Sequence, residues 1–95
     1  MSAKIEDLTQ EVVRIREERD WNKFHTPKNI AISLSVESAE LLEIFTWKTD
    51  DESKCLNESE LSKVKAEMGD ILFNLINLAQ TLNIDLLQSG FNKVK

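Results

Sequence analysis

The sequence is poor in residues that interrupt helices or cross-link a chain. Its 95 residues include one proline, two glycines and one cysteine. A single cysteine cannot form an internal disulfide, so no covalent cross-link stabilises the fold. Proline and glycine are the strongest helix breakers, and most of the other residues favour helices, so the composition predicts an all-α fold. A chain of this length is expected to form a single domain, residues 1–95.

The sequence also lacks a basic excess and a long apolar run. The 12 lysines and arginines are scattered and the formal net charge is −5, whereas proteins that bind nucleic acid through its phosphates present a basic face. The uncharged run 71–84 is too short to span a bilayer. The N-terminus is charged and has no apolar core segment. We therefore expect a cytoplasmic protein with neither nucleic acid nor a membrane as its partner.

Apolar residues at intervals of three and four positions predict four helices. The predicted helices cover approximately residues 4–21, 27–47, 58–82 and 85–95. Thr26, followed by proline, and Asn57, with a glutamate three residues later, are typical N-cap residues for the second and third of them. The acidic segment 48–58 shows no periodicity and is predicted to be a solvated loop.

Two pairs of carboxylates lie in the most apolar of these helices. Glu37 and Glu40 are three residues apart in the second helix, and Glu67 and Asp70 repeat the spacing in the third. Residues three apart are neighbours on a helix surface, so two such helices packed face to face would bring four carboxylates together. These charges would repel strongly without a cation between them. The sequence therefore predicts a metal site on a central helical hairpin.

The candidate ligands are all carboxylate oxygens, with no histidine or cysteine beside them. Hard oxygen ligands favour Mg²⁺, with Mn²⁺ as the alternative, and disfavour zinc. Mg²⁺ commonly binds a few carboxylates together with the phosphates of a substrate. A phosphate ester or anhydride is therefore the natural substrate class.

The predicted third helix is apolar around most of its circumference between residues 66 and 82. A helix of this kind is buried on several sides. A domain of 95 residues cannot cover all of those sides by itself, so the pattern predicts a homo-oligomer.

These residues resemble the MazG-like, all-α nucleoside triphosphate pyrophosphohydrolase superfamily. Its signature is Glu-x-x-Glu, a spacer and Glu-x-x-Asp, found here at residues 37–40 and 67–70. The segments 18–25, 27–29 and 45–50 are similar to those of the dCTP pyrophosphatase branch. The resemblance covers nearly the whole chain, and the joint pattern is more specific than either half.

The resemblance implies a four-helix fold that assembles as a dimer or a dimer of dimers, with the tetramer favoured. It implies hydrolysis of dCTP, or of a modified dCTP, to the monophosphate and pyrophosphate. The residues implied to hold Mg²⁺ and orient the attacking water are Glu37, Glu40, Glu67 and Asp70. The residues implied around the nucleotide are Trp21, His25, Asn29, Trp47, Lys48 and Asn74.

Other functions fit the same residues. Asn74 stands where an aromatic residue is common in the branch, and Val36 and Ala39 stand where glycines are common. Because these departures bear on base preference, a dUTP or phosphoribosyl-ATP pyrophosphohydrolase is an alternative. A helical dimerisation module without catalysis is another alternative, and it predicts no dependence on metal.

Overall fold

The protein is all-α throughout the part of the chain that the computed structural model describes, residues 4–20 and 23–95. Its helices are α1 (Ile5–Glu18), α2 (Pro27–Phe45), α3 (Asp50–Ser53), α4 (Glu58–Thr81) and α5 (Leu86–Lys93). The four predicted helices are all present, and α3 is additional. The predicted fold class is therefore confirmed, with one short helix that the sequence pattern did not indicate.

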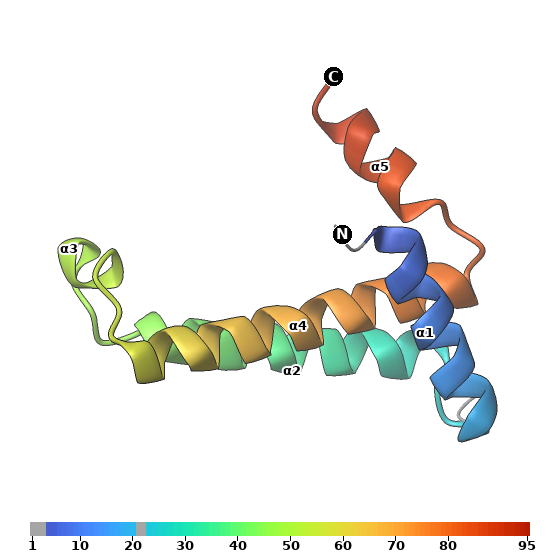
Figure 1. Ribbon diagram of the computed structural model, residues 1–95, viewed down its shortest axis with the longest axis horizontal. Coiled ribbons are helices and arrows are strands. Elements are labelled where there is room, and N and C mark those ends of the chain that lie inside the picture. Colours follow the sequence, from blue (N-terminus) through green and yellow to red (C-terminus); the bar gives the residue numbers. More distant parts are fainter. Residues whose placement is uncertain (1–3, 21–22) are drawn as a thin grey trace.

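Helices α2 and α4 form an antiparallel hairpin along the long axis of the molecule (Figure 1). Thr26 caps α2 by accepting a hydrogen bond from the backbone N–H of Asn29 at 3.2 Å, and Pro27 occupies the first helical position. Asn57 and Glu60 cap α4 reciprocally, at 2.8 and 3.1 Å. These caps satisfy backbone groups that a helix end otherwise leaves without partners. Both helices accordingly begin where the sequence predicted.

The linker between α2 and α4 was predicted to be a loop, and that prediction was wrong for residues 50–53. Thr49 and Glu52 form a capping box, with hydrogen bonds of 3.1 and 2.8 Å, that starts the single turn of α3. Polar caps form this turn without an apolar periodicity, so a search for periodicity misses it. Lys48 pairs with Glu60, and both side chains are largely buried. This ion pair fastens the linker to the first turn of α4.

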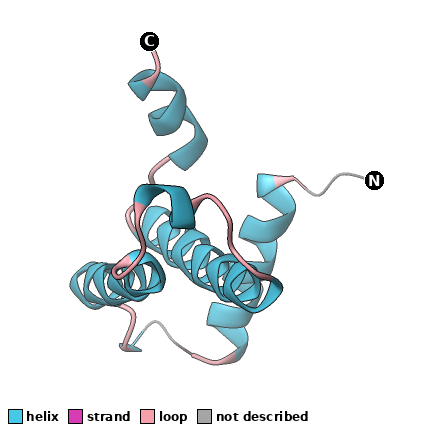
Figure 2. Cartoon of the chain, turned by 90° about the vertical axis from the view of Figure 1, so that its left-hand side faces the viewer, coloured by secondary structure: helices cyan, strands magenta, loops and turns pink. Residues whose placement is uncertain are grey.

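Helices α1 and α5 are found at the other end of the hairpin, near the start of α2 and the end of α4 (Figure 1). Viewed along the hairpin, α1 packs beside α4 while α5 projects away from the helix pair (Figure 2). The first helix ends at Glu18, earlier than predicted, because Asp20 adopts a φ of 51°, a left-handed conformation that stops an α-helix. Asn83 has a φ of 55° just after α4, and Asp85 caps α5 by accepting from the N–H of Gln88.

Few side chains are buried in the described part of the chain. They are Val12, Ile30, Val64, Ile76, Asn77 and Ala79, from α1, α2 and α4. Large apolar side chains such as Ile32, Leu42 and Met68 are more than half exposed. Within residues 4–20 and 23–95, no helix combines the length and apolarity that a membrane crossing requires. A single chain thus has a small core and leaves much apolar surface in contact with solvent.

Candidate metal and nucleotide site

Three carboxylates meet where α2 and α4 face each other. One oxygen from each of Glu37, Glu67 and Asp70 lies within 4.8 Å of the other two. Glu67 and Asp70 are neighbours on one face of α4, and Glu37 reaches them from α2. The hairpin therefore brings together three of the four candidate ligands that the sequence suggested.

Glu40, the fourth candidate, lies beside this group. It is exposed and one turn further along α2 than Glu37. It borders a shallow hollow that is also lined by Glu43, Ile44, Lys63 and Glu67. Because Glu67 belongs to both the cluster and the hollow, a ligand in the hollow would meet the cluster directly.

Two oxygens of the cluster are buried without a hydrogen-bond partner. These are Oε2 of Glu37 and Oε2 of Glu67. An unpaired buried carboxylate is costly, so the site requires either a proton or a cation. Carboxylate oxygens at this separation suit a hard divalent cation such as Mg²⁺. The residues present therefore fit the metal that the sequence suggested.

The pKa of Glu37 is raised to about 7 from its ordinary value near 4.5. The largest cause is a hydrogen bond shared with Glu67, followed by burial and by the nearby charges of Glu40, Asp70 and Glu67. When Glu37 is protonated, its carboxyl O–H can donate this hydrogen bond to Glu67, whereas two ionised carboxylates have no donor between them. A cation would favour the ionised form, so proton and metal compete for this carboxylate.

His25 lies just before α2 and contacts the second half of α4. The side-chain amide of Asn77 and Nδ1 of His25 are hydrogen-bonded at 2.9 Å, and Asn77 is fully buried. Burial and the charge of Arg16 lower the pKa of His25. Asn77 is two helical turns from Asp70, about 10 Å along α4. Sequence reasoning did not assign a role to Asn77; the available signal was a polar residue inside the longest uncharged run.

The two asparagines among the candidates, Asn29 and Asn74, donate hydrogen bonds to backbone carbonyls. The Asn29 amide donates to the carbonyl of Phe24 at 3.0 Å, and the Asn74 amide donates to the carbonyl of Asp70 at 3.1 Å. Asn74 therefore lies one turn from the carboxylate cluster, on the side toward Asn77. Asn29 instead fixes the segment that contains His25.

The remaining candidates are at the other end of the hairpin or outside the described residues. Trp47 is 93% exposed just beyond the end of α2, whereas His25 precedes the start of that helix. The length of α2 separates them by about 30 Å, so one chain cannot bring both to one nucleotide. Lys48 pairs with Glu60, and Trp21 lies outside the described residues.

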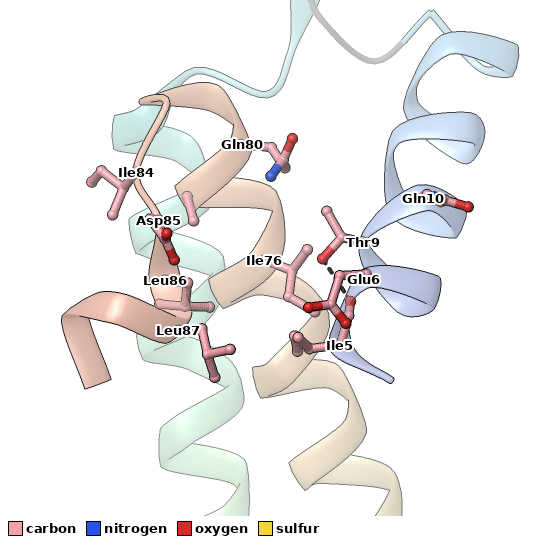
Figure 3. Close-up of a pocket in the computed structure, with 11 residues that line it drawn as sticks. Ile5, Glu6, Thr9, Gln10, Ile76, Gln80, Ile84, Asp85, Leu86 and Leu87 are labelled. Atoms are coloured by element: carbon pink, nitrogen blue, oxygen red, sulfur yellow. Dashed lines mark hydrogen bonds between the residues drawn. The ribbon is translucent and has the colours of Figure 1, made fainter. Parts of the chain in front are cut away.

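A second concave region lies between α1, the end of α4 and α5 (Figure 3). Its volume is about 480 Å³, and its lining includes Ile5, Thr9, Gln80 and Leu87. None of the candidate residues named above lines it. The carboxylate cluster, rather than this cavity, therefore defines the candidate site.

Known proteins are similar to this chain over nearly its whole length. No protein-family model matches the sequence. Over 95% of its length the chain is 34% identical to mouse dCTP pyrophosphatase 1 and 36% identical to the human protein, and it spans about half (54%) of each relative. The crystal structure of a pyrophosphatase from Archaeoglobus fulgidus matches with a TM-score of 0.89 and 36% identity, over 99% of this chain and 88% of that one.

Without divalent cations, the protein should lose stability as the pH rises through about 7. The pKa of Glu37 is near 4.5 in the unfolded state and about 7 in the folded state. Below pH 4.5 the carboxyl is protonated in both states. Above pH 7 the folded protein must hold the ionised carboxylate among like charges, so the stability that the proton supplied is lost. Thermal unfolding in EDTA should therefore give a lower Tm at about pH 8 than at about pH 6.

The matched control for this measurement is Glu37→Gln, which cannot ionise and should flatten this part of the pH dependence. Saturating Mg²⁺ should raise the wild-type Tm most at the higher pH, because binding stabilises the folded state. Equal pH dependence in wild type and Glu37→Gln would contradict the raised pKa of Glu37.

Proposed function

We propose that this chain, which belongs to the MazG-like, all-α nucleoside triphosphate pyrophosphohydrolase superfamily, hydrolyses a nucleoside triphosphate between its α- and β-phosphates. The products would be the monophosphate and pyrophosphate. The observation that carries the proposal is the group formed by Glu37, Glu67 and Asp70, with two buried oxygens that have no partner. A cluster of this kind suits a metal-chelating, anionic substrate.

Glu37, Glu67 and Asp70 would hold Mg²⁺, with Mn²⁺ as the alternative ion. The bound metal would supply positive charge opposite the phosphates and activate water. Ionisation of Glu37 would accompany metal binding, since its proton and the metal compete.

Glu40 and Lys63 are positioned to act beside this cluster. Glu40 is exposed and lines the hollow that adjoins Glu67, so its carboxylate is available to orient an attacking water and accept its proton. Lys63 lines the same hollow from α4, and its charge would attract the phosphates of an incoming nucleotide. In the proposed reaction, the protein would act chiefly by holding charged groups in position around the phosphates.

We assign dCTP, or a modified dCTP, as the favoured substrate. This choice rests on the names of the mouse and human relatives, which are dCTP pyrophosphatases. A dUTP or phosphoribosyl-ATP pyrophosphohydrolase is the alternative within the superfamily.

The active form would be a homo-oligomer, with a tetramer favoured over a dimer. Ile32, Leu42 and Met68 are more than half exposed on α2 and α4, and association would remove this apolar surface from water. A second copy is also required if Trp47 and His25 are to contact the same nucleotide, because one hairpin holds them at opposite ends.

The proposed activity is tested by measuring pyrophosphate release from each of the common ribo- and deoxynucleoside triphosphates with Mg²⁺. Hydrolysis should be abolished by EDTA, and dCTP should be among the best substrates. Glu37→Gln and Glu67→Gln should each lower kcat by about a hundredfold or more, as expected for loss of a charged group that acts in the transition state.

Glu58→Gln is the control for these variants, because this exposed glutamate lies on α4 away from the cluster and its replacement should leave kcat unchanged. A protein that releases no pyrophosphate from any triphosphate, or releases it equally in EDTA, would contradict the proposal. Preference for dUTP over dCTP would favour the alternative substrate.

Trp47→Ala should raise KM by about ten- to hundredfold if the indole stacks on the base, because such stacking contributes about 1–3 kcal/mol. The Tm should change little, since the side chain is 93% exposed in the single chain. Phe91→Ala, which removes an exposed aromatic residue from α5, is the control. An unchanged KM would remove Trp47 from the nucleotide site.

Ile32→Glu and Leu42→Glu should dissociate the oligomer, because each places a charge on an apolar surface that association would bury. Light scattering should give a larger mass for the wild type than for either variant. Lys65→Glu, on an exposed and already charged position of α4, should keep the wild-type mass. A wild-type protein that is monomeric at micromolar concentration would overturn the proposed assembly.

A further inference from the structure

Asn77 is the only polar or charged residue among the fully buried residues of the described chain. It lies in α4 between the buried apolar residues Ile76 and Ala79, within the longest uncharged run of the sequence. Burying an amide in apolar surroundings is costly unless it forms hydrogen bonds. The side chain of Asn77 is hydrogen-bonded to Nδ1 of His25 at 2.9 Å. His25 is far from Asn77 in the sequence. The contact therefore ties the segment before α2 to α4.

We propose that Asn77 is a positioning residue, whose buried amide holds His25 in one orientation and one tautomer for substrate recognition. The proposal rests on the proposed function, which it deepens. Asn77 Nδ2 donates to Nδ1 of His25. In neutral imidazole one ring nitrogen accepts and the other carries the proton, so the proton of His25 is on Nε2.

The orientation of the Asn77 amide follows from its burial. With Nδ2 toward His25, the atom left without a partner is the acceptor Oδ1. The reverse orientation would leave the N–H donors of Nδ2 buried and unpaired. Unsatisfied buried N–H groups are rarer in proteins than under-satisfied carbonyl oxygens. The arrangement with Nδ2 as donor is therefore the more stable one.

The backbone on both sides of His25 is held by α2. Asn29 donates its side-chain amide to the carbonyl of Phe24 at 3.0 Å, and the hydroxyl of Thr26 accepts from the backbone N–H of Asn29 at 3.2 Å. The carbonyl of Thr26 also accepts the first helical hydrogen bond, from the N–H of Ile30 at 2.9 Å. His25 is thus fixed by its neighbours to α2 and by Asn77 to α4.

This placement orients His25 relative to the carboxylate cluster. Asp70, Asn74 and Asn77 follow one another at intervals of four and three residues along α4, so Asn77 lies about 10 Å beyond Asp70. A nucleotide whose phosphates bind at the cluster can extend its nucleoside along this stripe toward His25. The Nε2 proton makes His25 a hydrogen-bond donor, which suits an acceptor atom on the nucleoside. Its lowered pKa keeps the ring neutral at physiological pH.

The tautomer can be measured directly, because His25 is the only histidine in the chain. A long-range ¹H–¹⁵N correlation spectrum of the ¹⁵N-labelled wild-type protein, recorded above the pKa of His25, should give the pattern of a single Nε2–H tautomer. A spectrum of the Nδ1–H tautomer, or of a mixture of the two, would overturn the proposal. This measurement needs neither a variant nor activity.

The role in recognition is tested with Asn77→Leu, which keeps a similar volume but removes the amide. We expect His25 to show a mixture of tautomers, and KM for the best triphosphate to rise by about tenfold, as for loss of one hydrogen bond, with kcat changed much less. Asn77→Asp is the second variant. Its carboxylate can only accept, so it should convert His25 to the Nδ1–H form and raise its pKa.

Thr81→Val is the matched control, one turn further along α4. Its hydroxyl donates to the backbone carbonyl of Asn77 and not to its side chain, so the variant should keep both the Nε2–H tautomer and the wild-type KM. An unchanged tautomer and KM in Asn77→Leu and Asn77→Asp would overturn the proposal and leave Asn77 as a packing residue. A single Nε2–H tautomer in a protein without triphosphate hydrolysis would overturn the proposed function and the recognition role, but not the Asn77–His25 bond.

Discussion

Repulsion among the carboxylates of Glu37, Glu67 and Asp70 is the constraint on which the α2–α4 hairpin depends. The two helices pack along most of their length and contain most of the small core. One oxygen from each of these three side chains lies within 4.8 Å of the other two, near the middle of this packing. A proton on Glu37 or a divalent cation must compensate these charges. The free energy of unfolding therefore depends on whether the site holds a proton or a cation.

In the proposed site, the same hairpin separates the metal-binding residues from the nucleoside-binding residues along α4. The carboxylates occupy one stretch of the helix, and Asn77 lies two turns away against His25. Because a helix is rigid over two turns, the spacing between these parts is set by the backbone. His25 is attached to both helices, so a change in how α2 packs on α4 would also move it. In the proposed site, metal binding and nucleoside recognition would therefore be coupled through the packing of α2 on α4.

Features that lie within one helix could be predicted from the sequence, and so could the meeting of Glu37 with Glu67 and Asp70 across the hairpin, whereas the finer contacts between helices could not. Thr26 with Pro27, and Asn57, marked the starts of α2 and α4 because caps are local interactions. The spacing of Glu67 and Asp70 likewise made them neighbours. The separation of Glu40 from the other carboxylates depends on the rotation and axial offset of α2 against α4, which no spacing within one helix specifies. The hydrogen bond between His25 and Asn77 joins two distant segments, so local patterns carry no sign of it.

In the proposed site, the residues whose replacement would change substrate preference with the least loss of stability are not the carboxylates. A shared proton or metal would compensate the repulsion among the carboxylates, so altering one of them would disturb the hairpin as well as the proposed chemistry. Asn74 and Asn77, by contrast, are neutral, and each acts through a single side-chain amide. Replacing a buried hydrogen-bonded pair by apolar groups of similar shape can be nearly neutral for stability. If the proposed site is correct, variation near Asn74, Asn77 and His25 would alter which nucleoside is accepted, while the carboxylate cluster and the packing of α2 on α4 would stay the same.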